Sequence, residues 1–267
     1  MKLKRLFVIC CTALTLNACS TSSTGRNQVL LYSSDDLDTM GFQLFELMKQ
    51  KEKISTDKEI NRFVQCVSSA ITINIPKSSH DGQWEVVVFD SDQVNAFALP
   101  GGKIGVYTGI LKVAENQDQL ATIIGHEVGH VIERHSNERI SSQQLSQRGM
   151  LIADAALESQ EVKNKNLYMS GLGLGLRYGV LMPYGRAHEN EADVVGQELM
   201  AKSGFNPKAS IKLWKNMAAL SNKNTLPEFM STHPSNKKRI NHLTTHLALS
   251  SKLYKSENNP KCYKPKS

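Results

Sequence analysis

The sequence predicts an α+β protein that is mostly helical and contains one small β-sheet. Residues 84–90 (WEVVVFD) are apolar and β-branched and lie between polar segments, which is typical of a strand. Residues 94–111 (VNAFALPGGKIGVYTGIL) hold a Pro-Gly-Gly turn between two short apolar runs, which indicates a hairpin. From about residue 116 to the end, apolar residues recur almost everywhere at helical spacing.

Residues 1–18 are expected to be a secretory signal, because basic residues precede an apolar run that is too short to span a membrane comfortably. The segment Leu16-Asn17-Ala18-Cys19 resembles the lipobox of bacterial lipoproteins, in which Cys19 would carry the lipid. The alternative is an ordinary signal peptide or a short uncleaved anchor. Ser20 follows the cysteine, and the bacterial sorting pattern then favours a periplasmic protein on the outer membrane over one on the inner membrane.

Residues 19–34 are rich in Ser and Thr and are predicted to tether the lipid to the folded body. Two helices are predicted within residues 35–75, where apolar residues such as Leu44, Leu47 and Met48 have helical spacing. The chain has no internal repeat and no second segment large enough for another core. We therefore predict one domain over residues 35–250 and a C-terminal tail over residues 251–267.

The charge and the cysteines add two expectations. The formal net charge is +7, but the basic residues are scattered, so no nucleic-acid partner is predicted. Cys10 and Cys11 lie in the predicted signal, so only Cys66 and Cys262 remain beside the lipid-carrying cysteine. An even pair in an oxidising compartment predicts one disulfide, and the alternative is two unpaired thiols.

The segment IIGHEVGHVIERH (123–135) sets two histidines one helical turn apart. His126 and His130 can then reach one ion at roughly 2.0–2.1 Å, while Glu127 lies beside that face and suits a general base. The neighbouring apolar residues place the histidines beside a buried stripe, although two hydrogen-bonded structural histidines are the simpler alternative. Gly125 and Gly129 weaken a helix, which predicts a close approach of backbone or substrate there.

A catalytic zinc site usually has three protein ligands and one open position. Residues 186–200 (RAHENEADVVGQELM) form a predicted amphipathic helix in which Glu189 and Asp193 share a face. One carboxylate can bind the metal while the other accepts a hydrogen bond from a ligand histidine, and spacing does not say which does which. Acidic residues at a helix start also serve simply to compensate the helix dipole.

Four motifs occur in order: VNAFALPGGKIGVYTGIL, GHEVGHVIERH, PYGRAHENEADVVG and STHPSNKKRI. Together they resemble the zinc metallopeptidase family that includes the CAAX prenyl protease, the heat-shock protease HtpX and periplasmic quality-control proteases. The resemblance implies a zincin-like domain with one zinc ion held by His126, His130 and Glu189, with Glu191 as the second choice for the third ligand. It further implies that Asp193 lies beside the ligands or donates a proton, and that residues 95–98 form an edge strand bordering the active-site cleft.

The resemblance implies a zinc metalloendopeptidase of the bacterial envelope, with Glu127 as the base and unfolded or misassembled envelope proteins as substrates. The alternatives are a chaperone-like lipoprotein with a structural or vestigial metal site, and a zinc hydrolase that acts on cell-wall peptides or lipids. The apolar run over residues 171–182 is interrupted by Arg177 and is too short to span a bilayer. We expect that run to be a core helix or a wall of the cleft.

His233 precedes Pro234, whose fixed backbone angle suits the first turn of a helix, so His233 is expected just outside that helix. A structural residue at a helix entry is one interpretation. In the resembling proteases, a His-Pro with an arginine downstream, here Arg239, lies near the zinc. His233 would then either stabilise the oxyanion or occupy the open zinc position and hold the enzyme inactive, and we favour the second.

Overall fold

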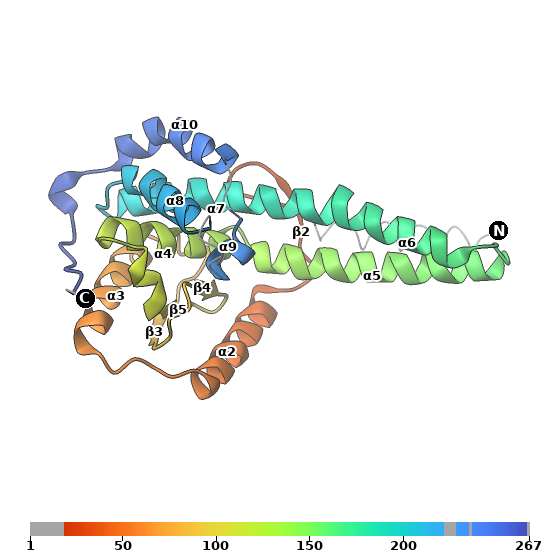
Figure 1. Cartoon of the computed structure of the whole chain (residues 1–267), viewed down its shortest axis with the longest axis horizontal. Coiled ribbons are helices and arrows are strands. Elements are labelled where there is room, and N and C mark those ends of the chain that lie inside the picture. The colour runs from red at the N-terminus through yellow and green to blue at the C-terminus, as the bar shows by residue number, and fades with distance from the viewer. Residues whose placement is uncertain (1–18, 222–227, 235–236, 266–267) are drawn as a thin grey trace. The chain divides into compact units, whose positions relative to one another are not determined.

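The computed structural model of the chain describes residues 19–221, 228–234 and 237–265 (Figure 1). The predicted signal over residues 1–18 lies outside the described residues. The described residues divide into two compact units, one of residues 19–33 and 133–188 and one of residues 34–132 and 189–265. The smaller unit joins the segment 133–188 to the N-terminal residues, and a single domain over residues 35–250 stays a prediction.

The larger unit begins with two helices, α2 (Ser34–Lys51) and α3 (Lys58–Thr72), which confirms the prediction for residues 35–75. Asp57 caps α3 because its carboxylate accepts hydrogen bonds from the backbone N–H groups of Glu59 and Ile60. The apolar residues of α3 then share one buried face, which is formed by Phe63, Val64, Val67 and Ile71.

The small predicted sheet is present and has three strands: β3 (Glu85–Phe89), β4 (Ala96–Leu99) and β5 (Lys103–Tyr107). Their order is β3-β5-β4, with β3 parallel and β4 antiparallel to the central β5. The Pro-Gly-Gly turn makes the β4–β5 hairpin, where Gly101 (φ 79°) and Gly102 (φ 69°) take left-handed angles that favour glycine. β4 is consequently an edge strand, as expected for residues 95–98.

Helices make up most of the rest of the larger unit, as predicted for residues beyond about 116. The buried helix α4 packs against α3, β4 and α8 and so lies at the centre of the core. α7 begins in the smaller unit and contributes its residues from Glu189 onward to this one. The elements are η1 (Thr108–Lys112), α4 (Gln117–Ile132), α7 (Met182–Lys202), α8 (Lys208–Ser221), α9 (Glu228–Thr232), α10 (Lys237–Leu253) and η3 (Ser256–Asn258).

The glycines of α4 allow α7 to approach closely, as the sequence predicted. A Cβ atom on Gly125 would lie 2.9 Å from the carbonyl oxygen of Gly196, and one on Gly129 would lie 2.9 Å from that of Ala192. Both distances are too short for a real Cβ contact, so only glycine lets the two backbones meet. This contact brings the α4 segment with His126 and His130 close to the α7 segment with Glu189.

The C-terminal tail packs on the larger unit by a covalent bond and by hydrogen bonds. A disulfide joins Cys262 to Cys66 of α3. The backbone N–H of Cys262 donates to the Gln117 side chain at the start of α4, and Lys264 Nζ donates to the Leu111 carbonyl at 2.7 Å. The tail is thus part of the folded unit rather than a separate appendage.

The smaller unit contains the hairpin β1 (Cys19–Thr21) and β2 (Asn27–Val29), and the helices α5 (His135–Ser159) and α6 (Lys165–Leu176). Arg26 binds Glu138 of α5 through two contacts of 2.6 and 2.7 Å, and Ser23 bonds to Glu133. These polar contacts hold part of the predicted tether against Glu133 and α5, and the tether over residues 19–34 stays a prediction.

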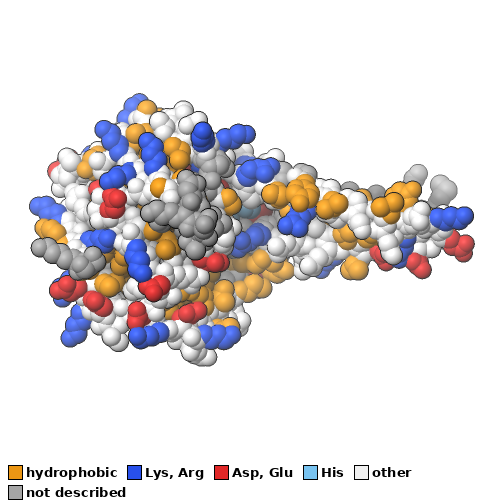
Figure 2. All heavy atoms as spheres, in the orientation of Figure 1, with side chains coloured by type: hydrophobic (Ala, Val, Ile, Leu, Met, Phe, Trp, Pro, Cys, Tyr) orange, Lys and Arg blue, Asp and Glu red, His pale blue; other side chains and the backbone are white. Residues whose placement is uncertain are grey.

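The helices α5 and α6 lie side by side and form a hairpin (Figure 1). A π-helical turn, η2 (Arg177–Leu181), continues α6 toward α7. No residue of α6 is buried, and Figure 2 shows hydrophobic side chains on the surface of this hairpin. The expectation of a core helix is therefore wrong for residues 171–176, and the cleft wall over residues 171–182 stays a prediction. Among the described residues, none of the helices is long and apolar enough to cross a membrane.

Candidate metal centre

The two histidines of α4 face the same point, as their spacing predicted. His126 Nε2 lies 3.2 Å from His130 Nε2, and the His126 side chain is almost completely buried. Phe229 and Trp214 pack edge-on against the His126 ring, with centroids 6.2 and 5.7 Å away. Burial among aromatic rings fixes the orientation of this imidazole and keeps bulk water from it.

The carboxylate of Glu189 on α7 reaches both histidines. Its Oε2 lies 3.3 Å from His126 Nε2, and its Oε1 lies 3.5 Å from His130 Nε2. Glu191 is also buried, but it does not join this group of side chains. The structure therefore brings Glu189, rather than Glu191, to the histidines.

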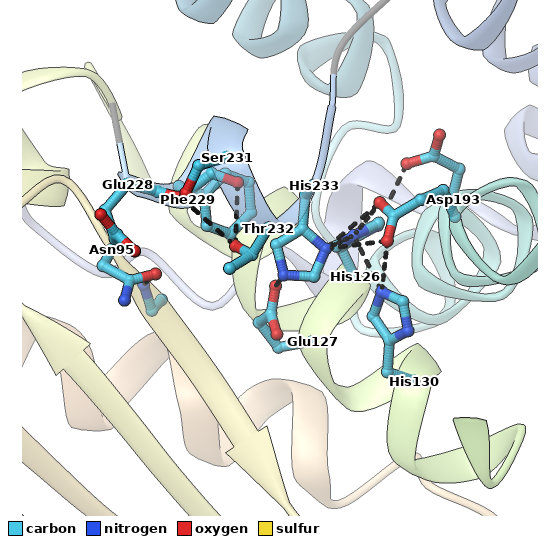
Figure 3. A network of polar contacts seen from close by, with 12 residues as sticks. Asn95, His126, Glu127, His130, Asp193, Glu228, Phe229, Ser231, Thr232 and His233 are labelled. Carbon is cyan, nitrogen blue, oxygen red and sulfur yellow. Dashed lines mark hydrogen bonds and ion pairs between the residues drawn. The ribbon is translucent and has the colours of Figure 1, made fainter. Parts of the chain in front are cut away.

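His233 follows α9 and completes the cluster (Figure 3). Its Nδ1 lies 3.2 Å from His126 Nε2 and 3.0 Å from Glu189 Oε1. The helix predicted to start at Pro234 does not include that residue, since α10 begins at Lys237, and residues 235–236 lie outside the described part of the chain.

The separations of these four side chains fit one tetrahedral metal ion. With bonds of about 2.0–2.1 Å, the ligand atoms of a tetrahedral zinc ion lie about 3.3–3.4 Å apart. His126 Nε2 lies 3.2 Å from both of the other ring nitrogens, and each of the three ring nitrogens lies 3.0–3.5 Å from one of the two Glu189 oxygens. With one ligand atom taken from each residue, all four atoms lie within 4.8 Å of one another. Three imidazoles and one carboxylate are also ligands that zinc prefers. The residues His126, His130, Glu189 and His233 therefore fit a metal.

Glu127 lies beside this cluster, and its Oε1 is buried without a hydrogen bond from the described residues. This Oε1 faces His233 Nε2 at 3.4 Å, an ion-pair contact (Figure 3). Burial raises the pKa of the Glu127 carboxyl, and the neighbouring His233 and His126 oppose part of this rise. A buried carboxyl with one free oxygen and a raised pKa has the properties of a general base.

Asp193 and Arg239 contact two of the proposed ligands, His126 and Glu189, and each other. Arg239 Nε and Nη2 each donate to Asp193 at 2.7 Å, while Arg239 Nη1 lies 2.8 Å from Glu189 Oε2. Asp193 Oδ1 in turn lies 3.1 Å from His126 Nδ1. Burial tends to raise the pKa of Asp193, but the charge and hydrogen bonds of Arg239 lower it by more. The net pKa is below its usual value, so the carboxylate stays ionised. The contacts orient two ligands at once.

The charges of the cluster compete for protons when no metal is bound. Burial lowers the pKa of His126, but Asp193 and Glu189 raise it more, to about 9. Burial raises the pKa of Glu189, whereas His126 and His233 lower it well below its usual range. A metal ion would therefore have to displace a proton from His126. The positive charge of the metal would then replace that of the proton beside the carboxylates of Asp193 and Glu189.

Trp214 of α8 is part of the site, although nothing in the sequence pattern indicated it. The Arg239 guanidinium lies over its ring, 3.9 Å from the centroid, and both side chains are fully buried. The indole also contacts the His126 ring. Trp214 thus fills the space between the arginine and a metal-ligand histidine. An aromatic residue in an amphipathic helix is usually core, so only the fold reveals this placement.

Helix α9 connects the cluster to the sheet. The backbone N–H of Phe229 donates to the Val94 carbonyl at 3.0 Å, one residue before Asn95 and the edge strand. Figure 3 shows α9 between His233 and the segment that carries Asn95, just before β4. All six predicted site residues (Glu127, Asp193, His233, His126, His130 and Glu189) therefore gather in the larger unit, next to the segment that leads into β4.

Sequence comparison finds relatives among proteases. The family description that matches residues 55–247 is peptidase family M48. The mitochondrial metalloendopeptidase OMA1 of Schizosaccharomyces pombe is 38% identical over 161 residues, which cover 60% of this chain and 45% of that protein. Human OMA1 is 29% identical over 231 residues (82% and 44%), and the β-barrel assembly-enhancing protease of Yersinia pestis is 25% identical over 234 residues (83% and 47%). The chain spans less than half of the length of each of these three relatives.

Proposed function

The chain belongs to peptidase family M48, and on this premise we propose that it is a zinc-dependent metalloendopeptidase of the bacterial cell envelope. It would hydrolyse peptide bonds in unfolded or misassembled envelope proteins. The observation that carries the proposal is the meeting of Glu127 with the cluster of His126, His130 and Glu189. A carboxylate with a free oxygen beside a three-ligand metal position is the arrangement that peptide hydrolysis needs.

The residues divide the chemical work in a simple way. One zinc ion, when bound to His126, His130 and Glu189, supplies a Lewis acid that polarises the scissile carbonyl and acidifies water. Glu127 accepts the proton of the attacking water at its free Oε1 and then delivers it to the leaving amine nitrogen. Asp193 and Arg239 hold His126 and Glu189 in position throughout.

The edge strand β4 suits the binding of an extended peptide. One of its edges pairs with β5, and the other has no strand partner within the described sheet. A substrate segment can pair with such an edge through backbone hydrogen bonds, which suits a protease that accepts many sequences. Helix α9 joins this strand region to His233, so a peptide along β4 would lie next to the metal cluster.

We propose that His233 acts as a gate rather than as an oxyanion donor. Its Nδ1 lies as near to His126 and Glu189 as a fourth metal ligand would, at 3.2 and 3.0 Å. In this position it would fill the place that a substrate carbonyl needs. A substrate would then have to displace His233, which keeps the resting activity low.

The same four-ligand arrangement favours one alternative, a chaperone-like lipoprotein with a structural metal site. A structural zinc ion is usually closed by four protein ligands, and His233 supplies the fourth. However, a purely structural site has no use for the buried Glu127 carboxyl, whose Oε1 has no hydrogen bond within the described residues and only a 3.4 Å contact with His233 Nε2. That oxygen favours the protease over the structural site. A third candidate, a hydrolase of cell-wall peptides or lipids, has no observation in its favour.

The envelope location is supported by the N-terminal cysteine and by the disulfide. Cys19 in its lipobox-like context would attach the protein to the periplasmic side of the outer membrane, with the inner membrane as the less favoured site. The Cys66–Cys262 disulfide is consistent with an oxidising compartment. A Cys19→Ser change should abolish incorporation of labelled palmitate, and unchanged incorporation would exclude the lipid.

The variant Glu127→Gln tests the function, because it removes the base and leaves every proposed ligand in place. We expect it to keep the metal and to lose casein cleavage, whereas Glu133→Gln, a buried glutamate outside the cluster, should keep both. Cleavage by Glu127→Gln at the wild-type rate would show that the mechanism is wrong. Comparison of envelope protein fragments from cells that carry wild type or Glu127→Gln would then identify the substrates.

A further inference from the structure

We propose that the hairpin formed by α5 and α6 docks on the surface of a lipid bilayer with anionic headgroups. The contact is made by exposed apolar side chains on the two helices, here called the hairpin face: Leu145, Leu151, Ile152, Leu167, Leu174 and Tyr178. This inference goes beyond peptide hydrolysis. For the choice of a bilayer as the partner, it rests in part on the proposed lipid at Cys19.

Helix α6 has a packed side and an exposed apolar side. Lys165, Met169, Gly173 and Leu176 are its partly buried positions, and their helical spacing forms the side toward α5. Leu167 and Leu174 are seven residues apart and so share another face, and Tyr178 follows in the turn η2. Their side chains are 70%, 57% and 59% exposed. A stripe of large apolar residues turned to solvent indicates an interaction surface.

Helix α5 repeats this pattern over the part that accompanies α6. Leu145 and Ile152 are seven residues apart on one face and are 45% and 71% exposed, and Leu151 is 70% exposed. Neither helix can cross a membrane, since among the described residues no helix has the necessary length and apolarity. An amphipathic helix of this kind lies in the interface, with its apolar side chains among the upper acyl chains.

The charges around the hairpin face suit phosphate headgroups. Within residues 133–188, exposed basic residues outnumber exposed acidic ones. The acidic residues are Glu158 and Glu161, and the basic residues are Arg134, Arg139, Arg148, Lys163, Arg177 and Arg186. The partly buried Lys165 lies 2.7 Å from Glu158 and so neutralises much of the acidic charge near the turn of the hairpin. Arg148 and Arg177 come from the same stretches as the apolar stripes. Basic residues beside an apolar face attract anionic lipid surfaces.

The N-terminal residues connect the hairpin to the expected lipid. Cys19 is the first residue of β1, and the chain from β1 onward is bonded to α5. Leu31 N–H donates to Ser141 Oγ at 2.9 Å, and Asn137 Nδ2 donates to the Tyr32 carbonyl at 2.7 Å. The residue that would carry the lipid and the hairpin face therefore belong to one compact unit. Acyl chains at Cys19 would hold this unit at the bilayer, where a second, reversible contact stabilises attachment.

Vesicle binding by the chain from residue 19 onward with Cys19→Ser tests the proposal without any attached lipid. This protein keeps every other residue that the structure describes. We expect it to co-sediment with phosphatidylglycerol–phosphatidylethanolamine vesicles. The triple change Leu167→Ser, Leu174→Ser and Tyr178→Ser should lower the partition coefficient by at least about tenfold, since it removes most of the α6 stripe.

A matched control exists in the larger unit. Ile73, Leu249 and Tyr263 are 82%, 55% and 82% exposed, and their change to serine removes side chains of the same kinds. This control should bind vesicles as the parent does. Reversal of two charges, Arg148→Glu with Arg177→Glu, should weaken binding at low salt and leave it nearly unchanged on pure phosphatidylcholine.

A fluorescent label provides a readout that does not depend on the triple variant. With Cys66 and Cys262 joined, a Leu174→Cys change leaves one thiol for an environment-sensitive dye. Vesicles should shift its emission to the blue, whereas the same dye at Ile73→Cys should not respond. Absence of vesicle binding by the parent, or equal binding by all variants, would overturn the proposal. Self-association that the triple change removes, with vesicle binding unaffected, would assign the hairpin face to a second copy instead.

The same samples separate this proposal from the proposed function. The triple variant should retain its metal and cleave soluble casein as the parent does, because the hairpin face lies outside the metal cluster. If the parent bound vesicles but cleaved no substrate, only the peptidase assignment would fall. If it cleaved casein and ignored vesicles, only the docking surface would fall.

Discussion

Asp193 Oδ1 lies 3.1 Å from His126 Nδ1, the ring nitrogen opposite the one that faces the metal cluster. The same carboxylate receives two bonds of 2.7 Å from Arg239. The aspartate therefore holds His126 by the nitrogen that faces away from the cluster, and leaves Nε2 as the nitrogen that would meet a metal.

This contact predicts that Asp193→Asn lowers zinc affinity by about 10–100-fold, the usual effect of losing such a partner. The amide can no longer supply the negative charge that favours the required imidazole orientation. Competition with a chelator of known affinity measures the change. Glu138→Gln is the control, since Glu138 is another buried carboxylate bound by an arginine but lies outside the cluster. Equal affinity in wild type and Asp193→Asn would contradict the role.

The proposed ligands predict about one zinc per chain, because they form a single cluster with room for one ion. His126→Ala and Glu189→Ala should each lose most of the metal, because each change removes one of the three proposed ligands and leaves His233 as the only replacement beside the other two. His135→Ala should keep it, although His135 is equally buried, because it stacks on His188 and not on the cluster. Metal analysis after dialysis checks this, and stoichiometric zinc in both ligand variants would remove the proposed site.

The change His233→Ala distinguishes a gate from an oxyanion donor by the sign of its effect. A gate that closes nine molecules in ten would, when removed, raise basal casein cleavage about tenfold. Loss of an oxyanion donor would instead lower turnover by roughly 10²–10³. We expect the increase. The comparison variant is His246→Ala, whose imidazole contacts Glu198 and not the metal cluster. Unchanged turnover and unchanged zinc content in His233→Ala would leave only a structural role.

The contacts of Glu138 predict an acid-sensitive contribution to stability. Burial tends to raise the pKa of Glu138, but hydrogen bonds from His188 and Arg26 lower it to about 2. Because this folded pKa lies below the unfolded value of about 4.3, the stabilisation is complete above pH about 4.3 and is lost as the pH falls toward about 2. It amounts to about 3 kcal/mol as an order of magnitude.

Glu138→Gln should therefore be less stable than wild type at pH 7, with a difference that shrinks between pH 4.5 and 2, roughly the interval between the two pKa values. Urea unfolding across this pH range measures the difference. Asp92→Asn is the control, since its carboxylate is exposed and pairs with Lys112 at the surface. A difference that stays constant with pH would show that charge on Glu138 contributes nothing.

The Cys66–Cys262 disulfide predicts that both sulfurs resist thiol reagents until a reductant is added. The bond closes a loop with a sequence separation of 196 residues, and loss of such a bond typically costs about 2–4 kcal/mol of stability. Mass spectrometry of alkylated, non-reduced protein tests this, with Cys66→Ser as a reference that leaves Cys262 free to react after unfolding. Labelling of both thiols in the non-reduced wild type would exclude the bond.

The sequence by itself determined the features that depend on local geometry. His126 and His130 had to face one point, because residues four apart share a helix face, and Glu127 had to lie beside them. The Pro-Gly-Gly turn, the strand over residues 85–89 and the two helices within residues 35–75 follow in the same way from nearby residues. These features needed no knowledge of which segments pack together.

Only the tertiary structure decided the features that join distant segments. Glu189 and Glu191 lie about 200° apart around a helix, so the packing of α7 on α4 determines which one meets the histidines. Helices far apart in sequence likewise determine three other features of the site. His233 approaches the cluster, Arg239 bonds to Asp193, and Trp214 lies between Arg239 and His126. Apolar residues in α6 predicted a buried helix, yet its packing leaves them exposed. Whether a helix is buried depends on the elements that pack against it, and the sequence of the helix alone does not determine these elements.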